Sequence, residues 1–363
     1  MKTAAFILIF CMLAIRLNAN EEISAPDSKL EWLVFPVYDS DIGFGLGSKG
    51  FYLNPFAYNE SFDALVFAST KGERWFRFAF SLPDFELRQG KVYDWAFDFI
   101  IDYDLMIKNS FFGVGNDSKF EDREYYSREP LDISLTLSRG FTKEIVAQTG
   151  VRMRTIRNYN FTEESILNKL TPELNEGKTH ACSFFIIGRY DTRDSYVNPK
   201  NGFVAQAETE YTPNVSFNNV HFLKWAADLQ YYHLFKNLNT VLACRFRTEN
   251  VNGDSLPVQL LLPIGGNRTL RGATQDRYLD KLISVLNLEC RFPIIDIFGY
   301  NLGGIFGIDA GKVWERISYV DIKDWRIAPV VGLRYYFYTY VARVDIGFGN
   351  ETTGVYFNFG HMF

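Results

Sequence analysis

Two short motifs in the second half of the chain combine a charged residue with flanking glycines. They read Gly265-Gly266-Asn267-Arg268-Thr269-Leu270-Arg271-Gly272-Ala273 and Phe306-Gly307-Ile308-Asp309-Ala310-Gly311. A guanidinium that loses its hydration is best satisfied by a planar carboxylate that accepts two parallel hydrogen bonds. Glycines beside such a group let the backbone turn tightly and approach a wall closely. The chemistry that these residue types offer is therefore that of a structural ion pair.

Catalytic or metal-binding chemistry has less support in the sequence. Of the four histidines, His233 and His361 share parity with apolar neighbours at the ends of expected strands, and no serine and acid are aligned with either. Cys182, Cys244 and Cys290 are widely spaced and lie beside apolar residues, so they indicate neither a disulfide framework nor a zinc site. We therefore expect no enzyme activity, no metal and no cofactor.

The elements that must position the two motifs are β-strands. The clearest lies at 92–104, where one parity is Tyr, Trp, Phe, Phe, Ile and Tyr and the other carries Asp94, Asp98, Asp102 and Asp104. Aromatic residues make up 17% of the chain, yet mean hydropathy is slightly negative. This mixture is typical of strands with one face to lipid and one to water. The sequence predicts an all-β, transmembrane antiparallel barrel.

The same alternation recurs along the chain and predicts sixteen strands. We expect them near 31–38, 41–54, 61–70, 73–83, 92–104, 124–139, 144–157, 180–190, 202–213, 219–236, 238–250, 282–293, 298–310, 326–337, 340–349 and 353–363. An even number returns both chain ends to the same side of the membrane. With the N-terminus in the periplasm, the long connections 105–123, 158–179 and 251–281 would be extracellular.

The N-terminal residues have the pattern of a secretory signal peptide. Lys2 precedes an apolar run, and Leu17-Asn18-Ala19 is a plausible cleavage site, so 1–19 is the expected signal peptide, 20–30 a short segment and 31–363 the barrel. The apolar run is too short to span a bilayer. A net charge of −5 without a basic block argues against a nucleic-acid partner.

The motifs that contain Arg271 and Asp309 resemble the Gly-Gly…Arg-Gly loop and the Phe-x-x-Asp-x-Gly strand of the bacterial surface antigen barrels, the BamA/TamA-type outer-membrane assembly superfamily. The resemblance implies a 16-stranded barrel in which an extracellular loop folds into the lumen. It also implies that Arg271 of the loop meets Asp309 of the wall. The implied loop residues are Gly265, Gly266, Leu270, Arg271 and Gly272, and the implied wall residues are Phe306, Asp309 and Gly311.

A second resemblance lies before the ninth expected strand. The segment with Asp191, Arg193, Asp194, Pro199 and Gly202 is similar to the periplasmic Asp-x-Arg-Asp…Pro-x-x-Gly turn of these barrels. The proline fixes one dihedral angle, the glycine relaxes another, and the charged side chains can satisfy free backbone groups. The segment is predicted to be a structural turn.

The last expected strand resembles the C-terminal signal that outer-membrane barrels present to the barrel assembly machinery. Its signal residues are Gly354, Phe357, Phe359 and Phe363, and the three phenylalanines are expected on one face. The resemblance implies a location in the bacterial outer membrane, with the lipid bilayer and the assembly machinery as expected partners.

The chain departs from the family pattern in two respects. Ala273 replaces the aromatic residue that usually follows Arg-Gly, and the few residues before the barrel leave no room for a periplasmic POTRA domain. We therefore expect a POTRA-less barrel that assists insertion or translocation of protein or lipid, with a separate protein partner or client. Gly43, Gly45 and Gly47 could soften the wall near the junction of first and last strands, or simply make room in a crowded barrel.

The alternative is a passive pore or structural barrel. Lumen-facing charged residues would then line a wet channel, and the candidates are Asp94, Asp98, Asp102, Asp104, Glu289 and Arg291.

Overall fold

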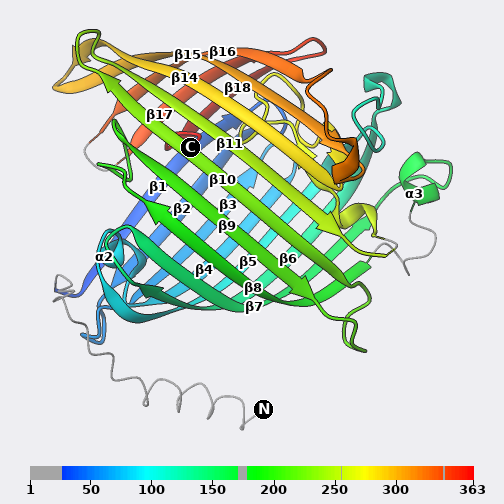
Figure 1. Cartoon of the computed structure of the whole chain (residues 1–363), viewed down its shortest axis with the longest axis horizontal. Coiled ribbons are helices and arrows are strands. Elements are labelled where there is room, and N and C mark those ends of the chain that lie inside the picture. The colour runs from blue at the N-terminus through cyan, green and yellow to red at the C-terminus, as the bar shows by residue number, and fades with distance from the viewer. Residues whose placement is uncertain (1–26, 171–177, 255, 338–339) are drawn as a thin grey trace.

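The computed structural model describes residues 27–170, 178–254, 256–337 and 340–363. These residues form a closed barrel of sixteen antiparallel strands and a separate two-stranded sheet (Figure 1). The predicted signal peptide 1–19 and most of the segment 20–30 lie outside the described residues. No helix in the described part of the chain is long and apolar enough to cross a membrane.

The barrel strands follow one another in chain order around the wall. They are β1 (Lys29–Asp39), β2 (Gly43–Leu53), β3 (Ser61–Ser69), β4 (Glu73–Leu82), β5 (Tyr93–Phe111), β6 (Glu124–Gly140), β7 (Ile145–Tyr159), β8 (Lys178–Asp191), β9 (Gly202–Thr212), β10 (Phe222–Phe235), β11 (Thr240–Asn252), β14 (Leu282–Ile297), β15 (Tyr300–Trp314), β16 (Arg326–Tyr336), β17 (Val341–Phe348) and β18 (Thr353–Phe359). The two-stranded sheet is β12 (Leu262–Ile264) and β13 (Tyr278–Asp280), and the short helices are α2 (Phe85–Arg88), η1 (Phe120–Asp122), α3 (Ile166–Leu170), η3 (Val258–Leu260) and η4 (Ile317–Tyr319).

The prediction of a sixteen-stranded barrel is confirmed, and each expected segment overlaps one barrel strand. Alternation succeeds because one face of each strand meets the lumen and the other faces outward. On β4, for example, Trp75 and Arg77 bond with Asp102 in the lumen, whereas Phe76 and Phe78 are exposed on the outer face.

One strand breaks its own alternation. Tyr93 and Trp95 share parity and were both expected on the lipid face, yet Tyr93 is buried beside Ala96 whereas Trp95 is exposed. The pairing of β5 with β6 shifts register between Tyr93 and Ala96, and an extra residue in one strand reverses which face the preceding side chains occupy. Tyr93 is therefore a lumen residue instead of a lipid-facing one.

The two ends of the barrel differ. The loops with η1, α3 and η4 gather at one end, called here the loop end, whereas α2 lies at the other, the turn end (Figure 1). The first part of the connection 105–123 belongs to the wall, because β5 continues to Phe111. The long connections at the loop end thus begin further along the chain than expected.

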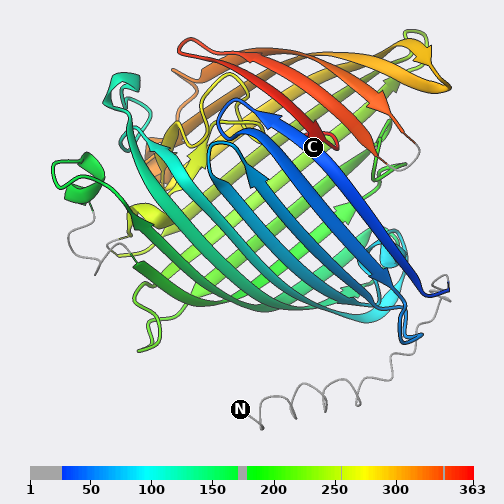
Figure 2. The ribbon, with the colours of Figure 1, turned by 180° about the vertical axis from the view of Figure 1, so that it is seen from behind.

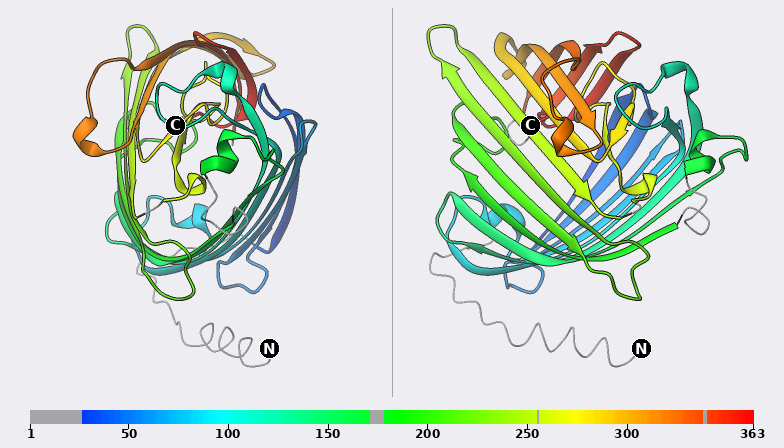
Figure 3. Two further views of the ribbon diagram at one scale, coloured as in Figure 1. Left: turned by 90° about the vertical axis from the view of Figure 1, so that its right-hand side faces the viewer. Right: turned by 45° about the vertical axis from the view of Figure 1, so that its right-hand side comes forward.

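The lumen near the loop end is packed like the interior of a soluble protein. Residues 256–281, called here the lumen loop, carry β12 and β13 and lie inside the ring of strands (Figure 3). Their apolar side chains and those of the surrounding wall form one cluster, which comprises Ile156, Ala181, Val220, Phe222, Val251, Leu260, Leu262, Ile264, Leu270, Ala273, Tyr278, Ile283, Val285, Val313 and Ala328. Burial of this apolar area holds the loop in the lumen.

Candidate functional site in the barrel lumen

The lumen loop reverses direction at its two adjacent glycines. Gly265 and Gly266 have φ angles of 131° and 77°, a region that side chains with a Cβ rarely adopt. The Thr269 hydroxyl accepts from Gly265 N (2.8 Å), and Gly266 N donates to Ala273 O (2.9 Å). These bonds close a compact turn that carries Arg271 toward the wall.

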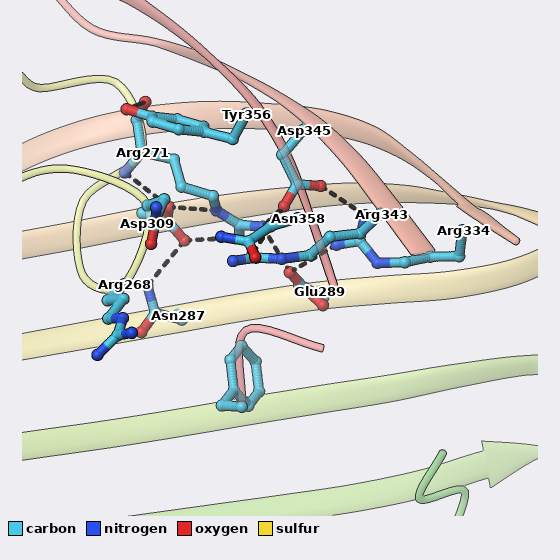
Figure 4. A network of polar contacts seen from close by, with 12 residues as sticks. Arg268, Arg271, Asn287, Glu289, Asp309, Arg334, Arg343, Asp345, Tyr356 and Asn358 are labelled. Carbon is cyan, nitrogen blue, oxygen red and sulfur yellow. Dashed lines mark hydrogen bonds and ion pairs between the residues drawn. The ribbon is translucent and has the colours of Figure 1, made fainter. Parts of the chain in front are cut away.

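Arg271 lies against Asp309 of β15 in bidentate geometry (Figure 4). Its Nε donates to Asp309 Oδ2 (2.8 Å) and its Nη2 to Asp309 Oδ1 (2.9 Å), while its backbone N donates to Oδ2 (3.1 Å). Asn287, which pairs with Asp309 across β14 and β15, donates to Asp309 Oδ1 (2.8 Å) and to Thr269 O (2.8 Å). Both charged side chains are fully buried.

Arg271 also joins two further carboxylates of the wall. Its Nη1 donates to Glu289 Oε1 (2.7 Å) on β14 and to Asp345 Oδ2 (3.1 Å) on β17. Three wall arginines complete the network around these acids: Arg291 bonds Glu289, whereas Arg334 and Arg343 bond Asp345. Burial opposes the charge of Arg271, but the surrounding carboxylates, Asp309 first, raise its pKa further above the usual value.

The loop backbone touches the β17–β18 hairpin at glycines. A Cβ on Gly272 would lie 2.5 Å from Gly349 N, and one on Gly349 would lie 2.0 Å from Gly272 O. Cβ atoms on Gly347 and Gly354 would each lie 2.4 Å from Arg271 O. Glycine at these positions permits a backbone approach that any side chain would prevent.

The remaining loop-motif and wall-motif residues have different surroundings. Leu270 and Ala273 are buried in the apolar cluster, and Gly311 leaves room for Ile264, whose Cδ1 would lie 3.0 Å from a Cβ there. Phe306 does not face the loop: it is 63% exposed on the outer wall and stacks on Phe292. Residues three apart in a strand point to opposite faces, so Phe306 and Asp309 cannot both face the lumen.

A second loop arginine is anchored nearer the loop end. Arg277 donates to both carboxylate oxygens of Glu351 (2.6 and 2.8 Å) and to the hydroxyl and carbonyl of Ser118 (2.8 and 2.7 Å). Its guanidinium lies 4.7 Å from the ring centre of Phe112 and 4.4 Å from that of Tyr278. The loop is therefore tied both to the β5–β6 connection and to the β17–β18 turn.

The segment before β9 is a tightly bonded turn. Asp191 accepts from the backbone N and the side chain of Arg193, and Asp194 accepts from the backbone N of Lys200 (2.8 Å). Gly202 has φ 121°, and a Cβ there would lie 2.5 Å from Thr192 O. Pro199 is buried. In this turn the Asp side chains bond backbone N–H groups.

The C-terminal residues depart from the expected strand. β18 ends at Phe359, and the chain turns at Gly360, which has φ 79°. Phe363 was expected on one face with Phe357 and Phe359, but its ring lies 5.2 Å from the Arg291 guanidinium and 6.4 Å from Tyr232, both lumen residues. His361, also expected beside lipid-facing neighbours, lies against Tyr336, with the two rings tilted and their centroids 5.8 Å apart. Because the positive φ of Gly360 changes the direction of the chain, the alternation of side chains between the two faces ends at this residue.

The junction of β1 and β18, called here the seam, has the fewest paired residues in the barrel. Its register consists of Tyr38↔Phe357 and Asp39↔Tyr356, extended by a bond from Ser40 N to Val355 O (3.1 Å). β16 and β17, by comparison, pair over seven residues. Figure 2 shows β1, in blue, continuing past the point where β18 ends near the C-terminus.

The glycines of β2 make room for aromatic rings beside the seam. A Cβ on Gly45 would lie 2.2 Å from the Phe67 ring, and one on Gly47 would lie 2.3 Å from the Phe35 ring. Both rings cover the lumen side of the strand, as aromatic residues do over sheet glycines. Of the two interpretations of these glycines, the packing one has direct structural support.

The lumen wall opposite the seam is lined by paired charges. The pairs are Arg152–Glu210, Arg154–Asp132, Lys224–Glu249, Arg245–Asp228 and Arg247–Glu249. A cavity of about 400 Å³ separates part of this wall from the leucines of the lumen loop. Among the described residues, no group of His, Cys, Asp and Glu side chains has an arrangement that could hold a metal ion.

Sequence reasoning missed most partners of Arg271. In the passive-pore alternative Glu289 and Arg291 would line a wet channel, yet both are buried in the ion network. Arg334, Arg343 and Asp345 were not singled out, although each is a charged residue at a lumen-facing position of an alternating strand. The sequence does show that these charged residues occupy lumen-facing positions. It does not show which charged residues pair, because the pairing depends on how the barrel closes.

Comparisons with known proteins place these features in a family. A family model described as the Omp85 superfamily domain matches residues 58–363. The fold is similar to BamA from Haemophilus ducreyi lacking POTRA domains 1-3, with a TM-score of 0.67 and 14% identity over 99% of this chain and 78% of that chain. It is also similar to CdiB from Escherichia coli (TM-score 0.66, 12% identity, 93% and 63% covered) and CdiB from Acinetobacter baumannii (0.55, 14%, 92% and 66%).

The chain thus spans less than two thirds of the length of either CdiB. A comparison with curated protein sequences gave no match.

Proposed function

Because the chain belongs to the Omp85 superfamily, we propose that it is an outer-membrane barrel that assists insertion or translocation of protein or lipid at its seam. In this proposal it acts as one part of a complex, with client recognition supplied by a separate protein. The bilayer and, for its own insertion, the barrel assembly machinery are its other partners. The proposal involves no enzymatic step.

The short pairing of the seam carries this proposal. β18 pairs with Tyr38 and Asp39, whereas β1 begins at Lys29, so most of this edge of β1 has no barrel strand beside it among the described residues. An unpaired edge presents a row of N–H and C=O groups, on which an extended segment can add as a further strand. The outward side chains Leu30, Trp32 and Val34 are 70%, 67% and 56% exposed, as suits a lipid-facing strand.

The energetics favour exchange at this place. Each hydrogen bond across the seam contributes about 0.5–1.5 kcal/mol, so few bonds oppose its separation. Unpaired backbone groups are costly within a bilayer, so an opened edge is stabilised when an incoming strand replaces the lost partner. β1 can therefore accept a client segment at a lower cost than any other strand of this barrel.

The test is the folding rate of an unfolded client barrel in liposomes that contain this protein, with an inert barrel of similar size as the control. A seam-locked variant sharpens it: Tyr38→Cys with Phe357→Cys, in a background where Cys182, Cys244 and Cys290 are serine, joins two directly paired positions. We expect acceleration in the reduced protein and none in the oxidised protein. Equal rates in both would exclude the seam as the site of insertion.

The lumen cavity favours a passive pore as the second candidate. Charged side chains line it, including Asp102, Arg154 and Lys224, and a polar lumen suits ion passage. The apolar cluster around the lumen loop fills the barrel toward the loop end and opposes this function. Single-barrel conductance discriminates the two, because a pore conducts with the lumen loop in place.

A further inference from the structure

The lumen loop bonds both strands of the seam. On the β18 side, Tyr356 Oη donates to Arg271 O (3.0 Å), and Thr352 Oγ1 donates to Gly272 O (3.0 Å). Arg277 adds its two bonds to Glu351, in the turn that precedes β18. The loop is thus fixed to β18 by hydrogen bonds, an ion pair and the close backbone approach at the hairpin glycines.

On the β1 side, the loop makes two contacts from positions eight residues apart in sequence. Asn267 Nδ2 donates to Asp39 Oδ2 (2.5 Å), and Gln275 N donates to Asp41 Oδ2 (2.9 Å). Asp39 is 2% exposed, and its other oxygen accepts from Asp41 N (2.8 Å). The two acids therefore form one short unit at the end of β1, and the loop holds it from two directions.

These contacts coincide with the paired part of the seam. Asp39 is the register partner of Tyr356, so the loop binds the two strands at the position where they pair with each other. Toward the turn end, the described loop residues make no hydrogen bond to β1 before Asp39, and the seam has no strand pairing there either. Loop contact and strand pairing begin at the same place.

The two sides are unequal in strength. The β18 side combines an ion pair with backbone packing that leaves no room for a side chain, whereas the β1 side consists of one amide-to-carboxylate bond and one backbone-to-carboxylate bond. Hydrogen bonds to a carboxylate are stronger than neutral ones, but two of them are fewer than the contacts opposite. If the seam separates, the loop therefore stays with β18 and leaves β1.

We propose that the lumen loop is an internal staple that holds the seam closed at the loop end, and that release of Asp39 and Asp41 is the step that frees β1. The proposal concerns how opening of the seam is regulated. It rests on the proposed function only for the role of that opening in client insertion. Asn267 is a positioning residue in this account. The loop and strand β18 move together, and the carboxylates of β1 and its turn are the releasable contact.

The test is hydrogen exchange of the folded protein in lipid nanodiscs. The staple variant is Asn267→Ala with Asp41→Ala, and the matched control is Arg268→Ala, which removes a neighbouring exposed loop-tip side chain without a described hydrogen bond to β1 or β18. We expect amides of 38–42 and 354–358 to exchange at least ten-fold faster in the staple variant, with β14 and β15 unchanged. Wild-type rates at the seam in the staple variant would overturn the proposal.

A second variant keeps the proposal testable if the first fails to fold. Asn267→Cys with Asp39→Cys, in the background without native cysteines, fixes the staple covalently when oxidised. We expect slower seam exchange in the oxidised than in the reduced form; equal exchange would contradict the staple. Client folding is measured in parallel. Altered exchange without any effect on client folding would sustain the staple and reject the insertion function, whereas seam-dependent insertion with unaltered exchange would reject the staple alone.

Discussion

Arg271 and Asn267 lie four residues apart in one loop and bind different parts of the barrel by different means. Arg271 is enclosed by three carboxylates on β14, β15 and β17, and all of these side chains are fully buried. Asn267 makes a single bond to Asp39 beside the seam. On one side the wall is continuously paired, and on the other only two residue pairs join the strands.

This difference separates a fixed region from a releasable one. A buried ion network is strongly destabilised when one member is lost, because a charge is left without its partner. A few hydrogen bonds at a strand edge separate at a cost that another strand can offset. The wall at β14–β17 therefore serves as the support, and the seam is where the barrel can change.

The largest expected effect is that of Arg271→Ala. Without the guanidinium, the buried Asp309 keeps bonds only from Asn287 and the loop backbone among its described partners. We expect the free energy of unfolding to fall by about 3–5 kcal/mol. The measurement is the urea midpoint of tryptophan fluorescence in detergent, with retention of heat-modifiable migration as the check that the variant still folds.

A double-mutant cycle with Asp309→Ala sharpens this prediction. If the two side chains act as a pair, the double variant loses less stability than the sum of the single variants. Simple additivity would show that the buried pair contributes no coupling and would remove the distinction between wall and seam.

Arg277→Leu should have an intermediate effect. Leucine retains an apolar side chain between the rings of Phe112 and Tyr278 but loses the bonds to Ser118 and Glu351. We expect a loss of about 1.5–3 kcal/mol, the range for hydrogen bonds to charged groups. The loss is smaller than for Arg271 because the Glu351 side chain is 29% exposed and water can replace its partner.

Limited proteolysis checks the location of that effect. Cleavage within 112–123 should accelerate in Arg277→Leu and remain unchanged in Arg271→Lys, which retains the loop-end anchor. Faster cleavage in both variants would mean that the two arginines hold one unit instead of two.

Ser40→Ala tests the seam itself and should have a smaller effect. The Ser40 hydroxyl accepts from Val355 N (2.7 Å), whereas the backbone bond from Ser40 N to Val355 O is independent of the side chain. We expect a loss of about 1 kcal/mol and faster hydrogen exchange at Val355. Ser48→Ala is the control, since Ser48 Oγ makes only a 3.4 Å bond to Leu33 O on the exposed part of β1 and β2.

Much of the barrel was predictable because its strands obey a local rule. Alternation of side chains requires only neighbouring residues, so it located all sixteen strands and the lumen face that carries Asp309. It failed at Tyr93 and Phe363, where a register shift and a glycine with positive φ reverse the direction of the side chains. Neither event has a unique signature in one sequence.

The ion network was less predictable for a different reason. Arg271, Glu289 and Asp345 come from distant segments, and only barrel closure together with the inward fold of the loop brings them within hydrogen-bonding distance. The contacts of Asn267 and Gln275 with β1 and its turn depend further on the position of the loop along the barrel axis. Their side-chain types alone are typical of any turn.

The last prediction is a pH dependence at the seam. Burial, and then the neighbouring Asp39, raise the pKa of Asp41 from 3.8 to about 7, while Gln275 N and Arg123 oppose the shift and Asp276 adds to it. Between these two pH values the folded protein retains a proton that the unfolded chain has released, so stability falls as pH rises through this window.

The stabilisation from Asp41 is therefore fully present below the unfolded pKa and is lost by about pH 7. We expect the urea midpoint of the wild type to decrease between about pH 5 and pH 8 relative to that of Asp41→Asn, which cannot titrate. Parallel pH profiles of the two proteins would contradict the prediction. A carboxyl that is destabilised once ionised is the weaker end of the staple, so mildly alkaline conditions should loosen the loop from β1 while Arg271 keeps it on the wall.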